Sequence, residues 1–401
     1  QMTTAWFFNI PTHGHINPTL PLVRELVRQG DEITYFAGPQ FAEKIEAAGA
    51  AYADYGDAYA FEQTRSEAHA VLQGSQLAEA TTALLPAILA AVEAQRPDYL
   101  LFDMSAPWGQ IAARRFDIPA VASFPHLPFN WRAFFSDKRL LKKGLHSLRP
   151  GQGYYRELQR QMSKLAREHN LRKPSEINVL SSSAELNIVF SSRYFQPYAG
   201  SLDESYLFIG PVIHTDRAAE AWPVKRQAGQ KLIYIAVGTL YQADLSFFRT
   251  CMEAFAGEQY AVIMSVGKAV EPADLGSIPH NFTVAQFVPQ LAILDEADLF
   301  ITHGGMNSIN EAVLAGVPMV VVPHTIEQAV NANRIEQLQA GLYLEPTAVS
   351  AARLRQAAQQ VLDDPDLQNG IEKIGQSFRD AGGVPRAVAA IHHLQQRHGL
   401  R

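Results

Sequence analysis

Short apolar runs alternate with longer segments of helical period along the first third of the chain. The runs and the helical segments that follow them are Ala5–Ile10 with Thr19–Arg28, Glu32–Ala37 with Phe41–Ala48, and Tyr99–Asp103 with Trp108–Phe116. Consecutive apolar positions are typical of strands that are buried on both faces. This alternation of strand and helix predicts a parallel sheet with crossover helices.

A second series of apolar runs follows after residue 230. Its members are Lys231–Val237, Ala261–Val266, Phe282–Ala285, Asp298–Thr302, Met319–Val322 and Gly341–Leu344. Between the two series, Gly210-Pro211 and the polar residues up to Gly229 indicate a linker. We therefore predict one α/β domain over 1–215, a linker over 216–229 and a second α/β domain over 230–380. The helical period of Val384–Gln396 makes the last segment, 381–401, a candidate for packing back on the first domain.

Composition narrows the classes of protein. Of the 401 residues, 47% are hydrophobic and 18% are charged, which excludes a disordered or fibrous chain. The 34 basic and 40 acidic residues give a net charge of -6, so we expect no nucleic-acid partner. The single cysteine, Cys251, allows no internal disulfide and favours a cytoplasmic location, with the thiol as inert packing. No apolar run reaches 18 residues, so we expect no membrane span.

One segment departs from this balance. Residues 132–173 hold 12 of the 34 basic residues, against three acidic ones. We favour a solvated helical insertion, with contact to a membrane surface or an anionic acceptor as the alternative.

Several motifs of common enzyme classes are absent from the sequence. It has no G-x-x-x-x-G-K-[ST] loop, no G-x-G-x-x-G turn after a strand and no G-x-S-x-G elbow. His13-Gly14-His15 has no further ligand at metal-binding spacing. Asp364-Pro365-Asp366 resembles a metal-binding Asp-x-Asp, but its place between helical segments favours a helix stop and an N-cap. We therefore predict no metal site.

The strongest chemical pattern is a strand that turns directly into a helix at 299–315. The strand ends in His303-Gly304-Gly305, and Asn307 and Ser308 follow at the start of the helix. Glycines let a ligand approach the backbone, and the N–H groups and dipole of a helix N-terminus attract negative charge. The pattern predicts an anion site, although such a turn can also be a plain connection.

The segments around this turn carry a resemblance. The stretch from Phe287 to Gln328 resembles the donor-binding motif of family-one glycosyltransferases that use uridine-diphosphate sugars, and looks closest to the microbial macrolide branch. His13-Gly14-His15-Ile16-Asn17-Pro18 also matches the family. The resemblance implies a GT-B fold, in which two Rossmann-like domains with parallel sheets face each other. The first domain would bind the acceptor and the second the nucleotide sugar.

The resemblance also implies roles for single residues. Phe287 would stack on the base and the Val288 backbone would read its edge. The ribose would lie near Gln290 and Glu311, and the sugar hydroxyls near Glu327 and Gln328. The remaining donor-binding residues, most of them around the diphosphate, would be Gly14, Gly238, Thr239, His303, Gly305, Asn307 and Ser308.

Two positions depart from the family pattern. Phe287 stands where the family usually has Trp, which keeps the stacking face but loses area and an N–H group. Glu327 stands where Asp or Gln is common. The choice between uridine and thymidine donors is therefore open, and glucose is the sugar we expect.

A histidine in the loop after the first strand is the candidate base. Open parallel sheets bind ligands at the edge where the carboxyl ends of their strands lie. A neutral imidazole at this edge can accept a proton from a hydroxyl. The family match assigns this role to His13, with His15 as a structural residue. Asp103, which ends another strand, would stabilise the resulting imidazolium, or would instead cap the helix after Pro107.

These observations predict an inverting, metal-independent transferase without a cofactor. It would move a sugar from a UDP-sugar to a hydroxyl of a hydrophobic acceptor such as a macrolide, a flavonoid or another phenol. Aromatic clusters in the first domain, around Tyr52 and around Trp108, suit such acceptors but could equally be core. The alternatives are a sugar-nucleotide epimerase of the same architecture and a non-catalytic nucleotide-sugar-binding protein.

Overall fold

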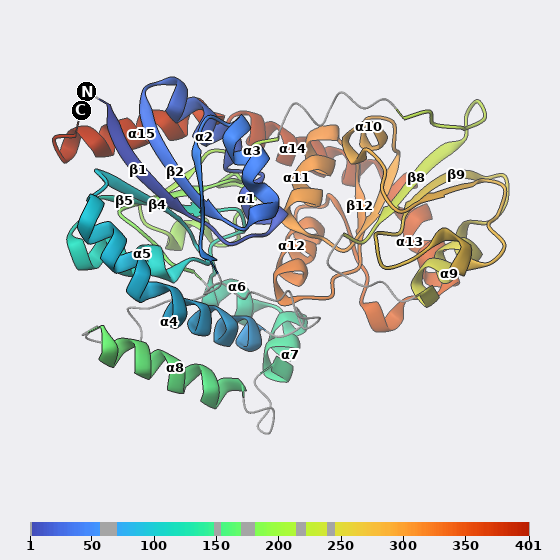
Figure 1. Cartoon of the computed structure of the whole chain (residues 1–401). Helices are drawn as coiled ribbons and strands as arrows, with labels where there is room; N and C mark the ends of the chain where they lie inside the picture. Colours follow the sequence, from blue (N-terminus) through green and yellow to red (C-terminus); the bar gives the residue numbers. More distant parts are fainter. Residues whose placement is uncertain are drawn as a thin grey trace. The chain divides into compact units, whose positions relative to one another are not determined.

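The chain forms two compact units in the computed structural model (Figure 1). The structure describes residues 2–56, 70–147, 154–169, 181–213, 222–238 and 245–400. One unit comprises 1–213 together with 379–401, and the other comprises 214–378. The expected linker, 216–229, is described only from residue 222, where it belongs to the second unit.

The first unit is built on a seven-stranded parallel sheet. The strands run in the order β3-β2-β1-β4-β5-β6-β7, so the direction of strand addition reverses between β1 and β4. The strands are β1 (Thr3–Phe8), β2 (Asp31–Ala37), β3 (Ala51–Asp54), β4 (Tyr99–Asp103), β5 (Ala120–Phe124), β6 (Leu186–Val189) and β7 (Tyr206–Phe208).

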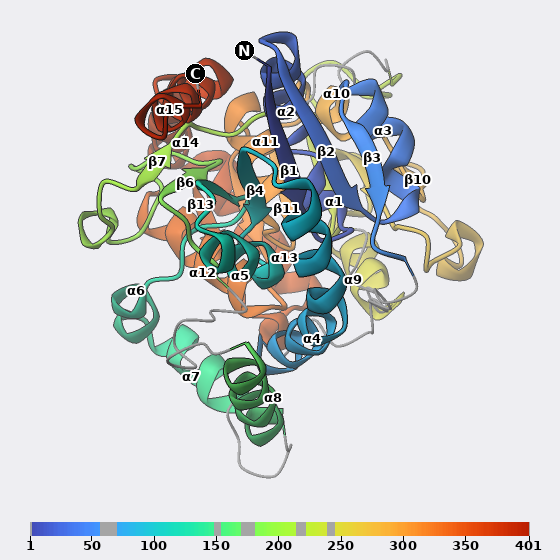
Figure 2. The ribbon, with the colours of Figure 1, turned by 60° about the vertical axis from the view of Figure 1, so that its left-hand side comes forward.

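Helices cover both faces of this sheet (Figures 1 and 2). One face packs against α4 and α5, and the other packs against α2, α3 and α15. The described helices of the unit are α1 (His13–Ile16), α2 (Leu20–Arg28), α3 (Ala42–Ala47), α4 (Ala70–Gln95), α5 (Pro107–Phe116), α6 (Trp131–Ser136), α7 (Lys138–Ser147), α8 (Tyr154–Glu168) and α15 (Gly383–Arg397), with short 3-10 turns η1 (Pro39–Phe41) and η4 (Ala199–Ser201).

The second unit repeats the plan with a six-stranded parallel sheet. Its order, β10-β9-β8-β11-β12-β13, reverses between β8 and β11, so both sheets follow the order of Rossmann-type folds. The strands are β8 (Lys231–Ala236), β9 (Tyr260–Ser265), β10 (Phe282–Ala285), β11 (Leu299–Thr302), β12 (Met319–Val321) and β13 (Gly341–Tyr343). The helices are α9 (Leu245–Phe255), α10 (Gln290–Leu294), α11 (Met306–Ala315), α12 (Ile326–Gln337), α13 (Ala351–Asp363) and α14 (Pro365–Arg379), with η6 (Pro272–Leu275) and η7 (Pro346–Ala348).

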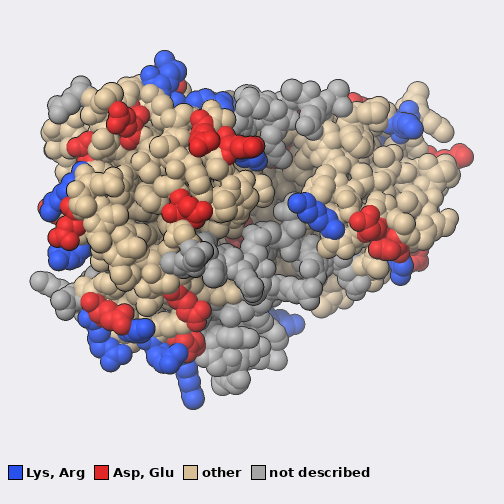
Figure 3. Space-filling view, in the orientation of Figure 1, with Lys and Arg blue, Asp and Glu red and all other residues tan. Residues whose placement is uncertain are grey.

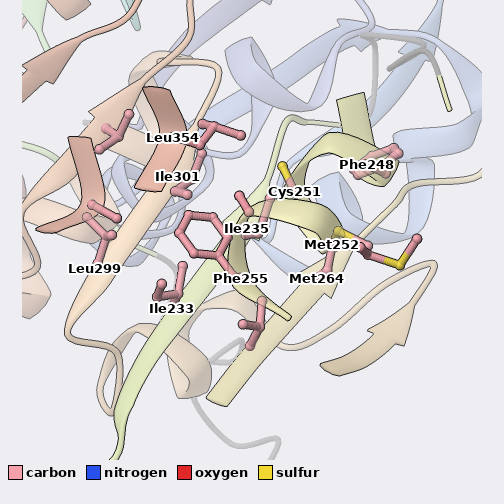
Figure 4. Packing of buried hydrophobic residues seen from close by; sticks show 14 of the residues in the cluster. Ile233, Ile235, Phe248, Cys251, Met252, Phe255, Met264, Leu299, Ile301 and Leu354 are labelled. Carbon is pink, nitrogen blue, oxygen red and sulfur yellow. The ribbon is translucent and has the colours of Figure 1, made fainter. Parts of the chain in front are cut away.

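The core of the second unit lies between its sheet and the helices α9 and α13 (Figure 4). Ile233, Ile235 and Ile301 from the sheet meet Phe248 and Phe255 from α9 in this core. Cys251 is fully buried among them, and burial raises the pKa of its thiol. The prediction that this cysteine packs in the core is confirmed.

The last helix returns to the first unit. The buried side chains of α15 join the core of the face that holds α2, and Gln395 Nε2 donates a hydrogen bond of 3.1 Å to Asp31 Oδ2 on β2. Tyr99 on β4 donates its hydroxyl to the same carboxylate oxygen at 2.8 Å. A buried carboxylate therefore ties α15 to two strands of the sheet.

One helix departs from the expectation that nothing in the chain could span a membrane. Within the described residues, Gln76–Gln95 of α4 is long and apolar enough to cross one, by length and composition alone. In the structure its apolar residues, including Leu77, Leu85 and Val92, belong to the core of the first unit.

The basic segment forms α7 and α8, with part of it outside the described residues. Helix α8 lies along α4 and buries Leu165. Arg156, Arg160 and Lys164 are exposed, and this end of the unit carries blue side chains interspersed with red ones in Figure 3. Arg160 pairs with Glu157 at 2.7 Å. The segment thus has the form of the solvated helical insertion that the sequence favours.

Candidate active site

The reversal of strand order in the first sheet brings the ends of β1 and β4 together. The chain leaves β1 at Phe8 and forms the helical turn α1, which holds His13 and His15, and β4 ends at Asp103. In open α/β sheets a ligand binds at such a reversal, outside the carboxyl ends of the strands. The segment after β1, which the sequence predicts as a loop, is a helical turn in the structure.

His15, not His13, is the partner of Asp103. The distance from His15 Nδ1 to Asp103 Oδ1 is 2.9 Å. The same oxygen accepts the Ser105 backbone N–H at 2.8 Å, and the carboxylate is completely buried. Helix α5 has Ala106 at its N-cap position, so Asp103 is not the cap of that helix.

His13 lies on the opposite side of the same turn. It is exposed, and its ring meets the edge of the Phe41 ring with 4.8 Å between the ring centroids. Residues two apart in a helix point about 200° apart, so only one of the two rings can face the sheet. The structure therefore pairs Asp103 with His15 in place of the predicted His13, whereas the assignment of the base to either ring stays a prediction.

A third residue completes this cluster, and sequence reasoning missed it. His126 lies two residues beyond β5, and its Nε2 is 2.8 Å from Nε2 of His15. Strand β5 is the neighbour of β4, so β1, β4 and β5 each contribute one member at the same edge of the sheet. A histidine soon after a strand end was the available signal, but β5 was not among the predicted strands.

The second unit places its own motif at the equivalent reversal. Gly238 follows β8 and His303 follows β11. A Cβ atom on Gly238 would lie 2.7 Å from His303 Nε2, and one on Gly305 would lie 2.6 Å from it. The two glycines thus enclose the imidazole, and Gly238 also has a positive φ of 83°. Thr239 lies outside the described residues.

Burial keeps the imidazole of His303 neutral. Desolvation lowers the pKa of His303 to about 4, and the nearby Glu327 carboxylate opposes this shift. At neutral pH this ring can therefore act as a hydrogen-bond donor without carrying charge.

Helix α11 begins at Met306, three residues after His303. Its N-cap residue, Gly305, has no side chain, and Asn307 and Ser308 are half-buried in the first turn. The backbone N–H groups of a first helical turn have no partner within the helix. Together with the dipole they favour a bound anion, and the anion site at this turn stays a prediction.

The two residues expected at the ribose lie side by side. Gln290 Nε2 donates a hydrogen bond of 2.6 Å to Glu311 Oε2, and Tyr234 donates its hydroxyl to Gln290 Oε1 at 3.1 Å. Glu311 is buried, whereas the ring of Phe287 is 47% exposed. Lys268 Nζ lies 5.9 Å from the centroid of that ring. Val288 is half-buried next to it.

Helix α12 carries the residues expected at the sugar. Gln328 Oε1 accepts the backbone N–H groups of His324 at 2.8 Å and Thr325 at 3.2 Å, and Thr325 caps the helix in return. The amide oxygen of Gln328 therefore has a structural role that the sequence did not predict. Glu327 Oε1 accepts from Asn331 Nδ2 at 3.1 Å, and Asn331 also donates to the Gly304 carbonyl at 2.9 Å.

The predicted donor residues divide between the two units. Gly14 belongs to the first unit, between the two histidines of α1, and the other described donor residues belong to the second. Within the described ranges, no group of three or more His, Cys, Asp or Glu residues is placed to hold a metal ion. Independence from metals stays a prediction.

The two Rossmann-like units thus define a two-domain α/β protein, with a histidine–carboxylate couple in one unit and a glycine turn before a helix N-terminus in the other. A family model for the C-terminal domain of erythromycin biosynthesis protein CIII-like proteins matches residues 250–392. The chain is 35% identical to the NDP-glycosyltransferase YjiC of Bacillus licheniformis, over 98% of each chain. It is 30% identical to the oleandomycin glycosyltransferase of Streptomyces antibioticus, over 98% of this chain and 91% of that protein.

A solved structure gives the same result. The crystal structure of the glycosyltransferase of kitacinnamycin matches with a TM-score of 0.83 and 28% identity, over 98% of this chain and 99% of that one. The chain therefore belongs to the family-one glycosyltransferases, and its fold is the GT-B fold.

Proposed function

We propose that this glycosyltransferase transfers a sugar from a nucleoside-diphosphate sugar to a hydroxyl group of a hydrophobic natural product, with inversion and without a metal ion. The observation that carries the proposal is the bond between His15 Nδ1 and the buried Asp103 carboxylate at the reversal of the first sheet. An ionised carboxylate accepts only, so Nδ1 carries the proton and Nε2 is the basic nitrogen.

The reaction follows from this tautomer. His15 Nε2 takes the proton of the acceptor hydroxyl while its oxygen forms a bond to the anomeric carbon. The bond from that carbon to the diphosphate breaks, and the nucleoside diphosphate leaves with the electron pair. Asp103 stabilises the imidazolium, and the first turn of α11 with His303 stabilises the leaving diphosphate. A single displacement inverts the anomeric centre.

The finer identity of donor and acceptor rests on the resemblance of the donor motif. Uridine and glucose are the donor parts that we propose, with the base on the exposed ring of Phe287 and the ribose at Gln290 and Glu311. The oleandomycin glycosyltransferase and the glycosyltransferase of kitacinnamycin are named for natural products, which supports an acceptor such as a macrolide, a flavonoid or another phenol.

The first experiment measures release of nucleoside diphosphate from UDP-glucose and dTDP-glucose, in EDTA, against a panel of macrolides, flavonoids and phenols. We expect acceptor-dependent release with at least one donor. The variants His15→Ala and His13→Ala then form a matched pair on one helical turn. His15→Ala should lose about 10²- to 10⁴-fold in kcat, and His13→Ala should keep most of its turnover. Normal turnover by His15→Ala would refute the assignment of the base.

The same assay separates the alternatives. An epimerase of this architecture would convert the donor sugar without acceptor and without net release of glucose. A nucleotide-sugar-binding protein would bind both donors but transfer to no acceptor. A binding protein needs only the motif of the second unit, so the His15–Asp103 couple favours the transferase.

A further inference from the structure

The side chain of His126 lies within hydrogen-bond distance of the basic nitrogen of His15. The two Nε2 atoms are 2.8 Å apart, and the ring planes are inclined at 74° with 4.6 Å between the centroids. This separation is that of a hydrogen bond, in which one ring must donate and the other must accept. The direction of the bond decides whether the basic lone pair of His15 is available.

The buried carboxylate fixes that direction. Asp103 accepts from Nδ1–H of His15, so Nε2 of a neutral His15 has no proton and accepts. The proton between the two rings then belongs to His126 Nε2. The lone pair that would receive the acceptor proton is already occupied by a neighbouring N–H group.

The backbone around His126 is fixed, whereas its side chain is not fully enclosed. Pro125 and Pro128 flank the residue, and Gln196 Nε2 donates to the Pro128 carbonyl at 3.2 Å. Asn130 then caps α6 by accepting the Arg132 N–H at 2.9 Å. His126 itself is half-buried, so part of the residue is open to solvent.

We propose that His126 is a positioning residue that occupies the basic nitrogen of His15 until an acceptor hydroxyl replaces it, and thereby limits attack by water on the donor. The inference rests on the proposed role of His15 as the base. Without such occupation, His15 could take a proton from water while the water oxygen bonds to the anomeric carbon and the nucleoside diphosphate leaves. The products would be free sugar and nucleoside diphosphate, with no transfer.

The test compares two variants at this position. Leucine in His126→Leu fills similar volume without a donor, and glutamine in His126→Gln keeps an N–H donor at a similar reach. The measured quantity is the ratio of UDP-glucose hydrolysis without acceptor to transfer with a saturating phenolic acceptor. We expect this ratio to rise about fivefold in His126→Leu, the factor of one net neutral hydrogen bond, and to return toward the wild-type ratio in His126→Gln.

The outcomes separate this inference from the role of His15. An unchanged ratio in His126→Leu, or an equal fall of both reactions in both variants, would overturn the proposal for His126. Retention of transfer by His15→Ala would instead refute the base on which it rests. A second measurement needs no variant: spectra of the full protein with ¹⁵N-labelled histidine should show His15 protonated at Nδ1 and His126 at Nε2. A proton on Nε2 of His15 would contradict the proposal.

Discussion

At the scale of single residues, opposite surroundings set the proton chemistry of two histidines. His15 is bonded to a buried carboxylate, which favours a proton on Nδ1 and stabilises positive charge when the ring accepts another. His303 is enclosed by Gly238 and Gly305, and its lowered pKa keeps it neutral. The first ring suits a base, and the second suits an uncharged donor beside a diphosphate.

Replacement of Asp103 tests the first arrangement. Asp103→Asn can present an N–H group to Nδ1 of His15, which would favour the wrong tautomer, so we expect kcat to fall on the order of 10²- to 10⁴-fold. Circular dichroism should show a folded protein. Asp117→Asn, the same change at an exposed position after α5, is the control and should leave kcat within about twofold. Equal kcat values for the two variants would show that Asp103 has no role in the proposed mechanism.

The pKa of His303 predicts how stability depends on pH. Well above pH 6.5 this group is neutral in both the folded and the unfolded state and contributes no pH dependence. Between pH 6.5 and about 4 the unfolded chain binds a proton that the folded chain does not, so the free energy of unfolding falls as the pH falls. Because part of the ring stays accessible, we expect a loss on the order of 1 to 2 kcal/mol by pH 5.

Urea unfolding of the wild type and of His303→Asn between pH 7 and pH 5 measures this loss. The variant lacks the titrating ring and should show a shallower pH dependence. Parallel pH dependences would mean that the pKa of His303 is not lowered in the folded protein.

At the scale of elements, the N-terminus of helix α12 positions the residues that the sequence predicts at the sugar. The capping box of Thr325 and Gln328 fixes where the helix begins, and Glu327 then lies in its first turn. Asn331, one turn later, bonds both Glu327 and the Gly304 carbonyl. The helix and the glycine turn after β11 are thus held together by one buried amide.

Loss of that amide should weaken donor binding. Asn331→Ala leaves the Gly304 carbonyl and Glu327 without this bond, which should lower the free energy of unfolding by about 1 to 3 kcal/mol and raise the KM for the donor several-fold. Gln337→Ala, on the exposed side of the same helix, is the control and should change stability by less than about 0.5 kcal/mol. A donor KM equal to that of the control would show that Asn331 serves stability alone.

The elements also show how far the sequence could be interpreted. Continuous apolar runs predicted β4 and β10 with the bounds that the structure has. Strands β3, β6 and β7 were missed, because they are only four, four and three residues long. Strand β5, Ala120–Phe124, was missed although it is buried, because small residues make up most of it. The choice between His13 and His15 needed the arrangement of β1 beside β4, which no local pattern contains.

At the scale of the whole molecule, the chain ends in the unit in which it began. Ile391, Leu394 and Val388 of α15 are buried in the core of the first unit, beside α2. This core therefore combines residues separated by nearly the whole length of the chain. The stability of the first unit therefore depends on residues that follow the second unit in sequence.

A core substitution in α15 tests this dependence. Ile391→Ala should lower the free energy of unfolding of the first unit by about 2 to 5 kcal/mol, while UDP binding by the folded protein stays unchanged. Arg397→Ala on the same helix removes an exposed pair with Glu185 and should cost less than about 1 kcal/mol. Thermal unfolding and UDP titration measure both effects. Equal melting temperatures for the two variants would contradict the role of α15 in this core.

Because α15 packs in the first unit, it also determines where two related enzymes can be joined to form a hybrid. A hybrid with a single crossover after residue 213 would combine the sheet of one parent with the last helix of another, and the side chains around Ile391 would no longer match their partners. Two crossovers avoid this mismatch: 1–213 and 379–401 come from one parent, and 214–378 come from the other. In sequence, the second unit is thus an insertion in the first, and we expect that it can be exchanged as one segment.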